Sequence, residues 1–409
     1  MTLADDRPVK LPPPRPPTPG QDGPHHRPLL RGHPIARVEL PDGHIGWLVG
    51  GYDEVRQVVT DSRFSRARAV APDRALLGFE VFASASISGM DPPEHTRLRR
   101  LVAKAFTVRR VEALRPRVAS IVGELIENML RGPQPADLVA AFALPLPVQV
   151  ICEMLGVPEA DMAQFHLWSD TVLGDWQRDS ELIMTAMVGM YEYFGRLIAM
   201  KRAAPADDLM TALIAARDDD DRLSEAELTT LGCTLLIGGH ETTANQISRS
   251  LVTLLGHTGE LERLVADPTL IPGGVEELLR FVQISGTLPP ARMATEDVAV
   301  GDVTVRAGEV VVPLYATANR DPSEFGDPDR LDVGRQLVSH LGFGAGAHHC
   351  LGAQLARMEL QEAFRGLLAR LPGLRLAVPA AQLSYKPGMA IFSLRELPVS
   401  WDAAGARHG

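Results

Sequence analysis

Cysteine is scarce in this sequence, and there is no excess of positive charge. The 409 residues include only three cysteines, Cys152, Cys233 and Cys350. An odd and low number of cysteines argues against a disulfide scaffold and is typical of a reducing compartment. Acidic residues outnumber basic ones, 51 against 41, which gives a formal net charge of −10. This balance disfavours nucleic acid as a general partner.

The sequence also shows no secretory signal and no long uninterrupted apolar run. Its first 19 residues are polar and rich in proline, unlike a signal peptide. The most apolar window, residues 138–157, is interrupted by Pro145, Pro147, Gln149 and Glu153, whereas a membrane span needs about 20 mainly apolar residues. We therefore expect a buried helix there, no membrane partner, and a soluble cytoplasmic protein.

A binding motif for a flavin or a nicotinamide is not apparent either. The nearest candidate, Gly344-Ala345-Gly346-Ala347-His348-His349, lacks the third glycine and the strand–helix setting of a dinucleotide fingerprint. No reductase is fused to the chain, so any electrons are expected to come from another protein.

The chain is expected to consist of an N-terminal arm and one domain. Nine of the 32 prolines fall in the first 28 residues, so residues 1–28 are predicted to be extended or disordered. Residues 29–409 are predicted to form a single domain. Two short apolar runs, 36–40 and 45–49, flank a Pro-Asp-Gly turn and predict a β-hairpin.

Most of the predicted domain is helical. Residues 52–282 have a helical pattern, and Ser224 with Glu227 forms a capping box that opens a helix continuing to about Leu255. Residues 298–315 contain short β-like runs, and a further helix is predicted from Cys350 to about Arg370. The fold class is therefore mainly α with small β-sheets.

Cys350 is the cysteine with the most unusual surroundings. Two glycines precede it at positions 344 and 346, and a good helix-forming sequence follows it. A thiol at a helix N-terminus has a lowered pKa, because free N–H groups and the helix dipole favour the thiolate. Such a thiolate can be a nucleophile or a metal ligand, and an inert packed cysteine is a further alternative. Zinc is disfavoured because His348 and His349 are adjacent, and the other cysteines lack ligand spacing.

The segment Phe343-x-x-Gly346-x-His348-x-Cys350-x-Gly352-x-x-x-Ala356 resembles the haem-binding loop of cytochrome P450 enzymes of the soluble bacterial type. The resemblance extends from about Ile35 to Trp401. It implies the P450 fold, with haem b between a long oxygen-activation helix and the helix after the cysteine. It also implies that Cys350 is the axial thiolate ligand of the haem iron. The other implied cofactor contacts in this loop are Phe343, Gly344, Gly352 and Ala356.

Three further segments resemble parts of the same family. Glu277 and Arg280 lie at i and i+3, where they can pair on one helix face. The resemblance identifies them as the family's ExxR pair, with Arg330 as the third member of a structural charge triad. Leu331 stands where many members have phenylalanine.

The second segment is Gly238-Gly239-His240-Glu241-Thr242-Thr243, inside the long helix. Glycine in a helix interior costs about 1 kcal/mol relative to alanine, so a reason is needed. The Thr242 hydroxyl can bond to the carbonyl of Gly238 and open the helix locally, which makes space for a small ligand. By resemblance, Thr242 donates a hydrogen bond during oxygen activation and Glu241 relays protons.

The third segment begins at Asp91 and includes His95 and Arg99. The two buried propionates of a haem need cationic or hydrogen-bonding partners. The resemblance assigns this role to His95, Arg99, Arg292 and His348.

The substrate pocket implied by the resemblance is mainly apolar, so an apolar or aromatic natural product is the expected substrate. For each of these residues an ordinary position in the core is an equally good interpretation. They are Phe79, Phe82, Ile87, Trp168, Ile237, Gly238, Ile284, Ser285, Leu288, Ile391 and Phe392.

The expected function is a haem-thiolate monooxygenase that uses O2 and external electrons. One alternative keeps the haem but directs it to oxidative C–C or C–N coupling, for example of aromatic cyclic dipeptides. Another is a haem-binding or sensor protein without turnover, which would not need Glu241 and Thr242. Ferredoxin and ferredoxin reductase are the expected donors, docking on a basic run that contains Arg97, Arg99, Arg100, Lys104, Arg109 and Arg110 and no acidic residue.

Overall fold

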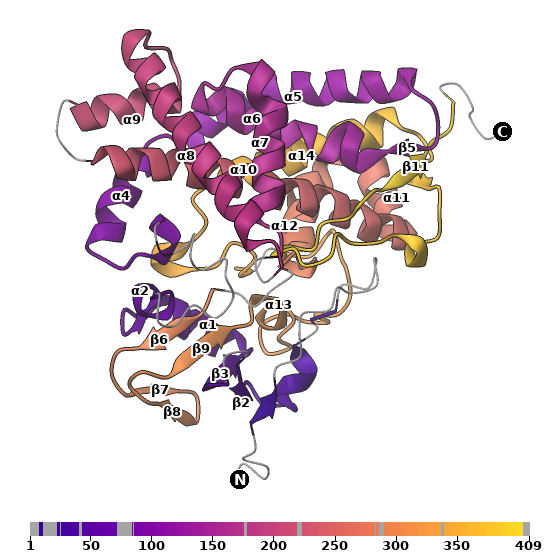
Figure 1. Cartoon of the computed structure of the whole chain (residues 1–409). Helices are drawn as coiled ribbons and strands as arrows, with labels where there is room; N and C mark the ends of the chain where they lie inside the picture. The colour runs from indigo at the N-terminus through magenta and orange to yellow at the C-terminus, as the bar shows by residue number, and fades with distance from the viewer. Residues whose placement is uncertain are drawn as a thin grey trace.

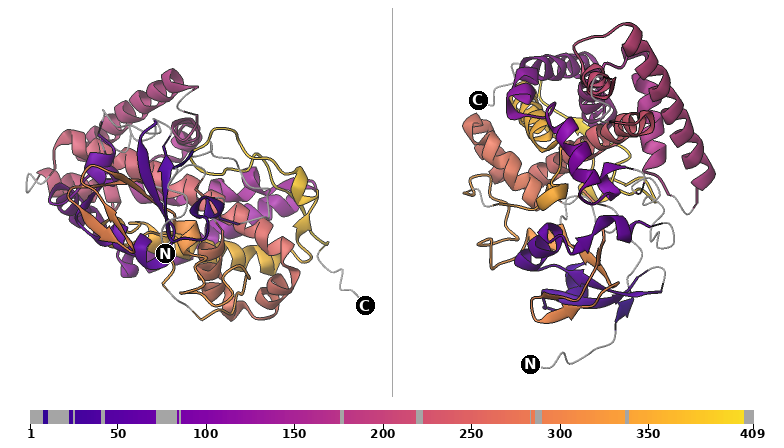
Figure 2. Two further views of the ribbon diagram at one scale, coloured as in Figure 1. Left: turned by 90° about the horizontal axis from the view of Figure 1, so that it is seen from below. Right: turned by 90° about the vertical axis from the view of Figure 1, so that its left-hand side faces the viewer.

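The computed structural model describes residues 8–10, 23–24, 26–40, 43–71, 84, 86–175, 178–218, 223–282, 284–285, 290–336 and 339–403. Most helices gather in one part of the molecule, and the largest sheet lies in the other part, next to the N-terminal segment (Figure 1). The right-hand view in Figure 2 shows the same division. The fold class expected from the sequence, mainly α with small β-sheets, is therefore confirmed.

The helices follow the predicted pattern closely. They are α1 (Tyr52–Thr60), α2 (Arg66–Ala69), α4 (Glu94–Ala103), α5 (Val108–Arg131), α6 (Pro145–Leu155), α7 (Met162–Val172), α8 (Ser180–Ala203), α9 (Leu209–Asp218), α10 (Glu225–Gly256), α11 (Thr258–Ala266), α12 (Ile271–Phe281), α13 (Tyr315–Ala318) and α14 (Ala353–Arg370).

Helix α10 is the central helix of the fold. It begins as predicted, because Ser224 accepts a hydrogen bond from the Glu227 backbone N–H and the Glu227 side chain accepts one from the Ser224 N–H. Most of its side chains are buried, and it packs against α6, α8 and α14. A helix buried on nearly all sides is expected only in the core of a large domain.

The strands form three small sheets. The largest has the order β1-β2-β3-β9-β6-β4, and the others are β10-β11-β5 and β7-β8. Their bounds are β1 (Val9–Lys10), β2 (Ile35–Glu39), β3 (Ile45–Val49), β4 (Phe64–Ser65), β5 (Ala136–Asp137), β6 (Arg292–Ala294), β7 (Val298–Val300), β8 (Val303–Val305), β9 (Val310–Pro313), β10 (Arg375–Leu376) and β11 (Pro398–Ser400).

The predicted hairpin is confirmed, and the proline-rich arm contributes a strand. β2 and β3 are antiparallel, with Ile35 opposite Val49 and Glu39 opposite Ile45. β1 pairs in parallel with β2, so Val9 and Lys10 are extended as expected but are ordered against the sheet edge. Within the described ranges, no helix combines the length and apolar character needed to cross a membrane.

Candidate functional site

Cys350 lies in a tightly folded loop immediately before α14. Its backbone N–H donates a hydrogen bond to the Phe343 carbonyl at 2.9 Å. Gly344 and Gly346 both have a φ of +68°, the left-handed region that favours glycine. A Cβ on Gly346 would also lie 2.7 Å from the Val59 carbonyl oxygen, so only glycine fits there. Arg357 covers Phe343, with its guanidinium carbon 4.6 Å from the ring centroid.

The environment of the Cys350 thiol differs from the sequence prediction in two respects. The helix begins at Ala353 rather than at Cys350 itself. The thiol is surrounded by protein, and this burial raises its pKa, while the Gly352 backbone and the charges of Arg99 and Arg357 act in the opposite direction. The residue nevertheless keeps an exposed surface. A cation bound to the sulfur would add to the effect of these two arginines and favour the thiolate further.

The middle of α10 exposes backbone beside polar groups. Gly238 is exposed although most of the helix around it is buried, and a Cβ added to it would meet no atom within 4 Å. Thr242 is half-buried, and its hydroxyl donates to the Gly238 carbonyl at 2.9 Å, as predicted. The helix stays continuous through this segment, so the expected local opening is not formed. The flat surface at Gly238 leaves room for a ligand.

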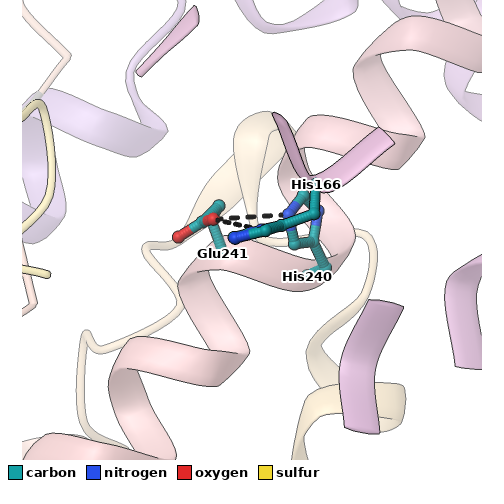
Figure 3. A group of neighbouring side chains, drawn as sticks. All are labelled: His166, His240 and Glu241. Atoms are coloured by element: carbon teal, nitrogen blue, oxygen red, sulfur yellow. Dashed lines mark ion pairs between the residues drawn. The ribbon is translucent and has the colours of Figure 1, made fainter. Parts of the chain in front are cut away.

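Glu241 is buried beside two histidines that the sequence reasoning missed. Its Oε1 lies 3.4 Å from His166 Nδ1 and 3.4 Å from His240 Nε2 (Figure 3). Burial alone raises the pKa of Glu241, but the two imidazoles outweigh that effect and the net shift is downward. Asn245 donates to the Glu241 backbone carbonyl at 2.7 Å. His240 is adjacent to Glu241 in the sequence, but nothing in the sequence places α7 beside it.

The four residues expected to bind the propionates contribute to one positive cluster. The His95 and His348 rings lie 4.3 Å apart between centroids. Burial lowers the pKa of His348 to about 3, and the charges of Arg292, His95, Arg66 and Arg99 act in the same direction. Arg66, which the sequence reasoning also missed, donates to the Ala291 carbonyl at 2.8 Å.

The positive cluster suits a dianionic group. Arg292 is buried, and its hydrogen bonds go to the backbone carbonyls of Pro290 and Ala291, both at 3.4 Å. Among the described residues no acidic side chain forms an ion pair with Arg292, and His95 Nδ1 is buried without a hydrogen-bond partner. The charge of Asp91 favours the guanidinium without forming an ion pair with it, and a buried guanidinium without a directly paired anion is costly. These residues therefore fit the two carboxylates of a haem.

The predicted charge triad forms with a different third member. Arg280 Nε lies 2.7 Å from Glu277 Oε2, as expected for the ExxR pair. Arg330 was expected to complete the triad, and this is wrong. Its side chain is 62% exposed, and only its backbone carbonyl takes part, accepting from Arg280 and Arg335. Arg335 binds Glu277 instead, because the loop after residue 330 turns back and brings the Arg335 side chain to the buried carboxylate.

The residues expected to form the substrate pocket do not all lie together. Ser285 and Ile391 form a β-bridge, and the Phe392 N–H donates to the Ile284 carbonyl at 2.8 Å, so these two segments do lie together. Trp168 packs edge-on against Phe165 of its own helix, α7, and against Tyr193 of α8. Ile237 is buried in the core and Ile87 packs on its edge. Phe79, Phe82 and Leu288 lie outside the described residues.

The basic run on α4 and the start of α5 is mostly exposed. Arg97 pairs with Glu227, and Arg99 donates to the His349 carbonyl beside Cys350. Arg100, Lys104, Arg109 and Arg110 are exposed, and among the described residues none of the four forms an ion pair. The contact of Arg99 places α4 directly against the cysteine loop.

Comparisons with known proteins all point to one family. The family model for cytochrome P450 matches residues 147–371. Nocardicin C N-oxygenase from Nocardia uniformis subsp. tsuyamanensis is 49% identical over 379 residues, which cover 92% of this chain and 95% of that protein.

Solved structures agree over nearly the whole chain. One is the LnmA cytochrome P450 hydroxylase from the leinamycin pathway of Streptomyces atroolivaceus S-140, with a TM-score of 0.89 and 45% identity, covering 96% of this chain and all of that one. Another is cytochrome P450mel 107F1 with biaryl coupling reactivity, with a TM-score of 0.88 and 39% identity, covering 94% and 98% of the two chains. This chain therefore belongs to the cytochrome P450 family of haem-containing oxidoreductases.

Proposed function

We propose that this protein is a haem b-dependent monooxygenase in which Cys350 is the thiolate ligand of the iron. The observation that carries this proposal is the buried positive cluster around Arg292 and His348, next to the loop that presents Cys350. When bound, the haem supplies the activation of O2 and the insertion of one oxygen atom into the substrate. The positive charges around His348 disfavour its protonated form. The same charges would favour the negatively charged Cys350 thiolate and propionates.

Each residue near the cofactor has a role that its position supports. His95, Arg99, Arg292 and His348 bind and orient the propionates. Phe343, which lies under Arg357, would pack beside the bound haem near Cys350. The other contacts in this loop are Gly344, Gly352 and Ala356, and neither of the two glycines has an atom closer than 3.9 Å to an added Cβ. Such a surface lets a flat macrocycle approach the backbone closely.

Thr242 and Glu241 are the residues that we propose to handle protons. The Thr242 hydroxyl now donates to the Gly238 carbonyl, and rotation about χ1 would redirect this proton into the open space beside Gly238. Glu241 is the buried carboxylate next in sequence, and as a carboxylate it can take up a proton and pass it to that hydroxyl. Neither side chain is needed to hold the haem, so their removal should affect turnover rather than cofactor content.

We propose a small, largely apolar or aromatic natural product as the substrate. The segments 284–285 and 391–393 meet near α10, where Asn245 donates to Ser393 Oγ at 2.9 Å. This supports a pocket whose walls are Ile284, Ile391 and the surface at Gly238. The similarity to a hydroxylase of a natural-product pathway supports oxygen insertion. The similarity to a P450 with biaryl coupling reactivity keeps oxidative coupling as the second candidate.

We propose that an acidic ferredoxin, reduced by a ferredoxin reductase, supplies the electrons. Arg100, Lys104, Arg109 and Arg110 are exposed, and they lie close in sequence to Arg99, which contacts the cysteine loop. Their positive charge contrasts with the net charge of −10 of the whole chain. Opposite charges would steer the donor to this face.

The test of this function is turnover with candidate natural products, ferredoxin, its reductase and NADPH. NADPH consumption matched by a product one oxygen atom heavier supports the monooxygenase. A product that has lost two hydrogens and gained no oxygen supports coupling. NADPH consumption that no candidate substrate stimulates, together with intact haem, would favour a binding or sensor protein.

A further inference from the structure

The cluster of His166, His240 and Glu241 has the composition of a metal site. His166 comes from α7, while His240 and Glu241 are consecutive on α10. One nitrogen of each imidazole and one oxygen of the carboxylate all lie within 4.8 Å of one another. Figure 3 shows both imidazoles directed at the same carboxylate oxygen.

The three converging atoms have no other partner. His166 Nδ1, His240 Nε2 and Glu241 Oε1 are each buried without a hydrogen bond among the described residues. His240 is fully buried and Glu241 is 1% exposed. A buried polar atom left unsatisfied costs about 1–3 kcal/mol. Three such atoms at one point therefore indicate that something else binds them.

The distances suit a metal ion better than direct hydrogen bonds. Both N···O separations are 3.4 Å, which is longer than an ordinary hydrogen bond. Zn²⁺ binds nitrogen and oxygen ligands at about 2.0–2.1 Å in tetrahedral geometry, which places two such ligands about 3.3 Å apart. Two imidazoles and one carboxylate, with water in the fourth position, form a recurrent zinc ligand set.

The surroundings of the cluster support coordination. His240 Nδ1 lies 3.1 Å from the Leu236 carbonyl, an arrangement that fixes the proton on Nδ1 and leaves Nε2 free to bind a metal. Asn245 Nδ2 lies 3.3 Å from the second oxygen of Glu241 and orients the carboxylate. The His166 side chain is 34% exposed, which gives an ion a route from solvent. The charge of nearby Lys386 is offset by its ion pair with Asp170.

We propose that His166, His240 and Glu241 bind one divalent transition-metal ion of the Zn²⁺ type, and that the bound ion inhibits turnover. Imidazole favours zinc over Mg²⁺ or Ca²⁺, which prefer oxygen ligands alone. The inhibition rests on the proposed role of Glu241, because a carboxylate held by a metal cannot deliver a proton to Thr242. Metal binding itself does not depend on that role.

Binding is tested on the haem-loaded full chain, treated with a chelator and then titrated with ZnCl2 in a calorimeter. We expect one Zn²⁺ per chain, confirmed by metal analysis after gel filtration. His166→Ala should weaken binding by at least about 100-fold, because it removes a direct ligand. His166→Cys supplies another zinc ligand and should restore binding. His257→Ala is the matched control, because His257 lies outside the cluster. Like His240, it has its Nδ1 close to a backbone carbonyl of α10, that of Thr253 at 2.8 Å.

Turnover separates the two parts of the proposal. Zn²⁺ should inhibit the wild type and leave His166→Ala uninhibited at the same concentration. Stoichiometric binding without inhibition would overturn the regulatory part alone and count against Glu241 as a proton donor. The metal site is wrong if Zn²⁺ binds His166→Ala as tightly as the wild type. It is equally wrong if no stoichiometric binding occurs. In that case, slow turnover of metal-free His166→Ala with an increased solvent isotope effect would identify the cluster as a proton path instead.

Discussion

Arg335 Nε lies 3.1 Å from both carboxylate oxygens of Glu277, and Arg280 binds the same carboxylate from its own helix. Both arginines also donate to the backbone carbonyl of Arg330. The buried carboxylate therefore holds α12 to the loop around residue 330 through two guanidinium groups. The side chain of Arg330 takes no part in this contact.

The first prediction compares two arginines five positions apart. Arg335→Ala removes a partner of the buried Glu277 and should lower the free energy of unfolding by about 1–3 kcal/mol, because Arg280 still compensates part of the charge. Arg330→Ala changes an exposed side chain and should stay within about 0.5 kcal/mol. Urea unfolding followed by circular dichroism measures both. Equal losses in the two variants would contradict the assignment of Arg335.

Local sequence signals predicted much of this fold, because their partners are near in the chain. The capping box of Ser224 and Glu227 marked the start of α10, and the Pro-Asp-Gly turn marked the β2–β3 hairpin. Similarly, Thr242 and Gly238 are four residues apart on one helix, so their hydrogen bond followed from helix geometry.

Contacts between distant segments were harder to predict. Arg330 and Arg335 have the same chemistry, and only the path of the loop decides which side chain reaches Glu277. His166 meets Glu241 because α7 packs against α10, and no periodicity in either helix specifies that contact. The thiol of Cys350 was expected to have a lowered pKa, but burial in the folded chain raises it.

A second prediction concerns the two adjacent glycines of α10. A Cβ at Gly238 meets no atom, so Gly238→Ala should keep or increase stability, with a gain of up to about 1 kcal/mol from helix propensity. A Cβ at Gly239 would lie 2.8 Å from Ile151 Cγ1. Gly239→Ala should therefore be less stable than Gly238→Ala by about 1–3 kcal/mol.

Thermal unfolding of the two haem-loaded variants measures this difference. Gly238→Phe provides a further check, because its side chain would fill the proposed pocket and should block the spectral response to substrates. Equal stability of the two alanine variants would contradict the packing described for α10.

The third prediction separates proton handling from haem binding. Removing a general acid–base group costs about 10²–10⁴-fold in rate. Thr242→Ala should therefore keep its haem content but form much less product per NADPH and release more peroxide. Thr242→Ser keeps the hydroxyl and should retain most of the coupling. Unchanged coupling in both Thr242→Ala and Glu241→Gln would show that these residues do not relay protons.

A fourth prediction tests the donor surface by charge reversal. Arg100→Glu and Lys104→Glu should slow reduction by an acidic ferredoxin severalfold, while substrate binding stays unchanged. Reduction of the wild type should slow as salt is added, because exposed charges are screened over about 8–10 Å at physiological ionic strength. Stopped-flow reduction measures both effects.

Arg131→Glu is the matched control for the donor surface. Arg131 is exposed at the opposite end of α5, about 30 Å along the helix from Arg110, so its reversal should leave reduction unchanged. Reduction that is indifferent to salt and to the reversals at Arg100 and Lys104 would exclude this surface as the docking site.

The central claim, that Cys350 binds the haem iron, is tested most directly by the absorption spectrum of the reduced protein under CO. The wild type should show the long-wavelength Soret band of a thiolate-ligated haem. Cys350→Ala should lose that band, while Cys233→Ala, which changes a buried cysteine of α10, should keep it. A Cys350→Ala protein that retained the thiolate band would contradict the account of this site.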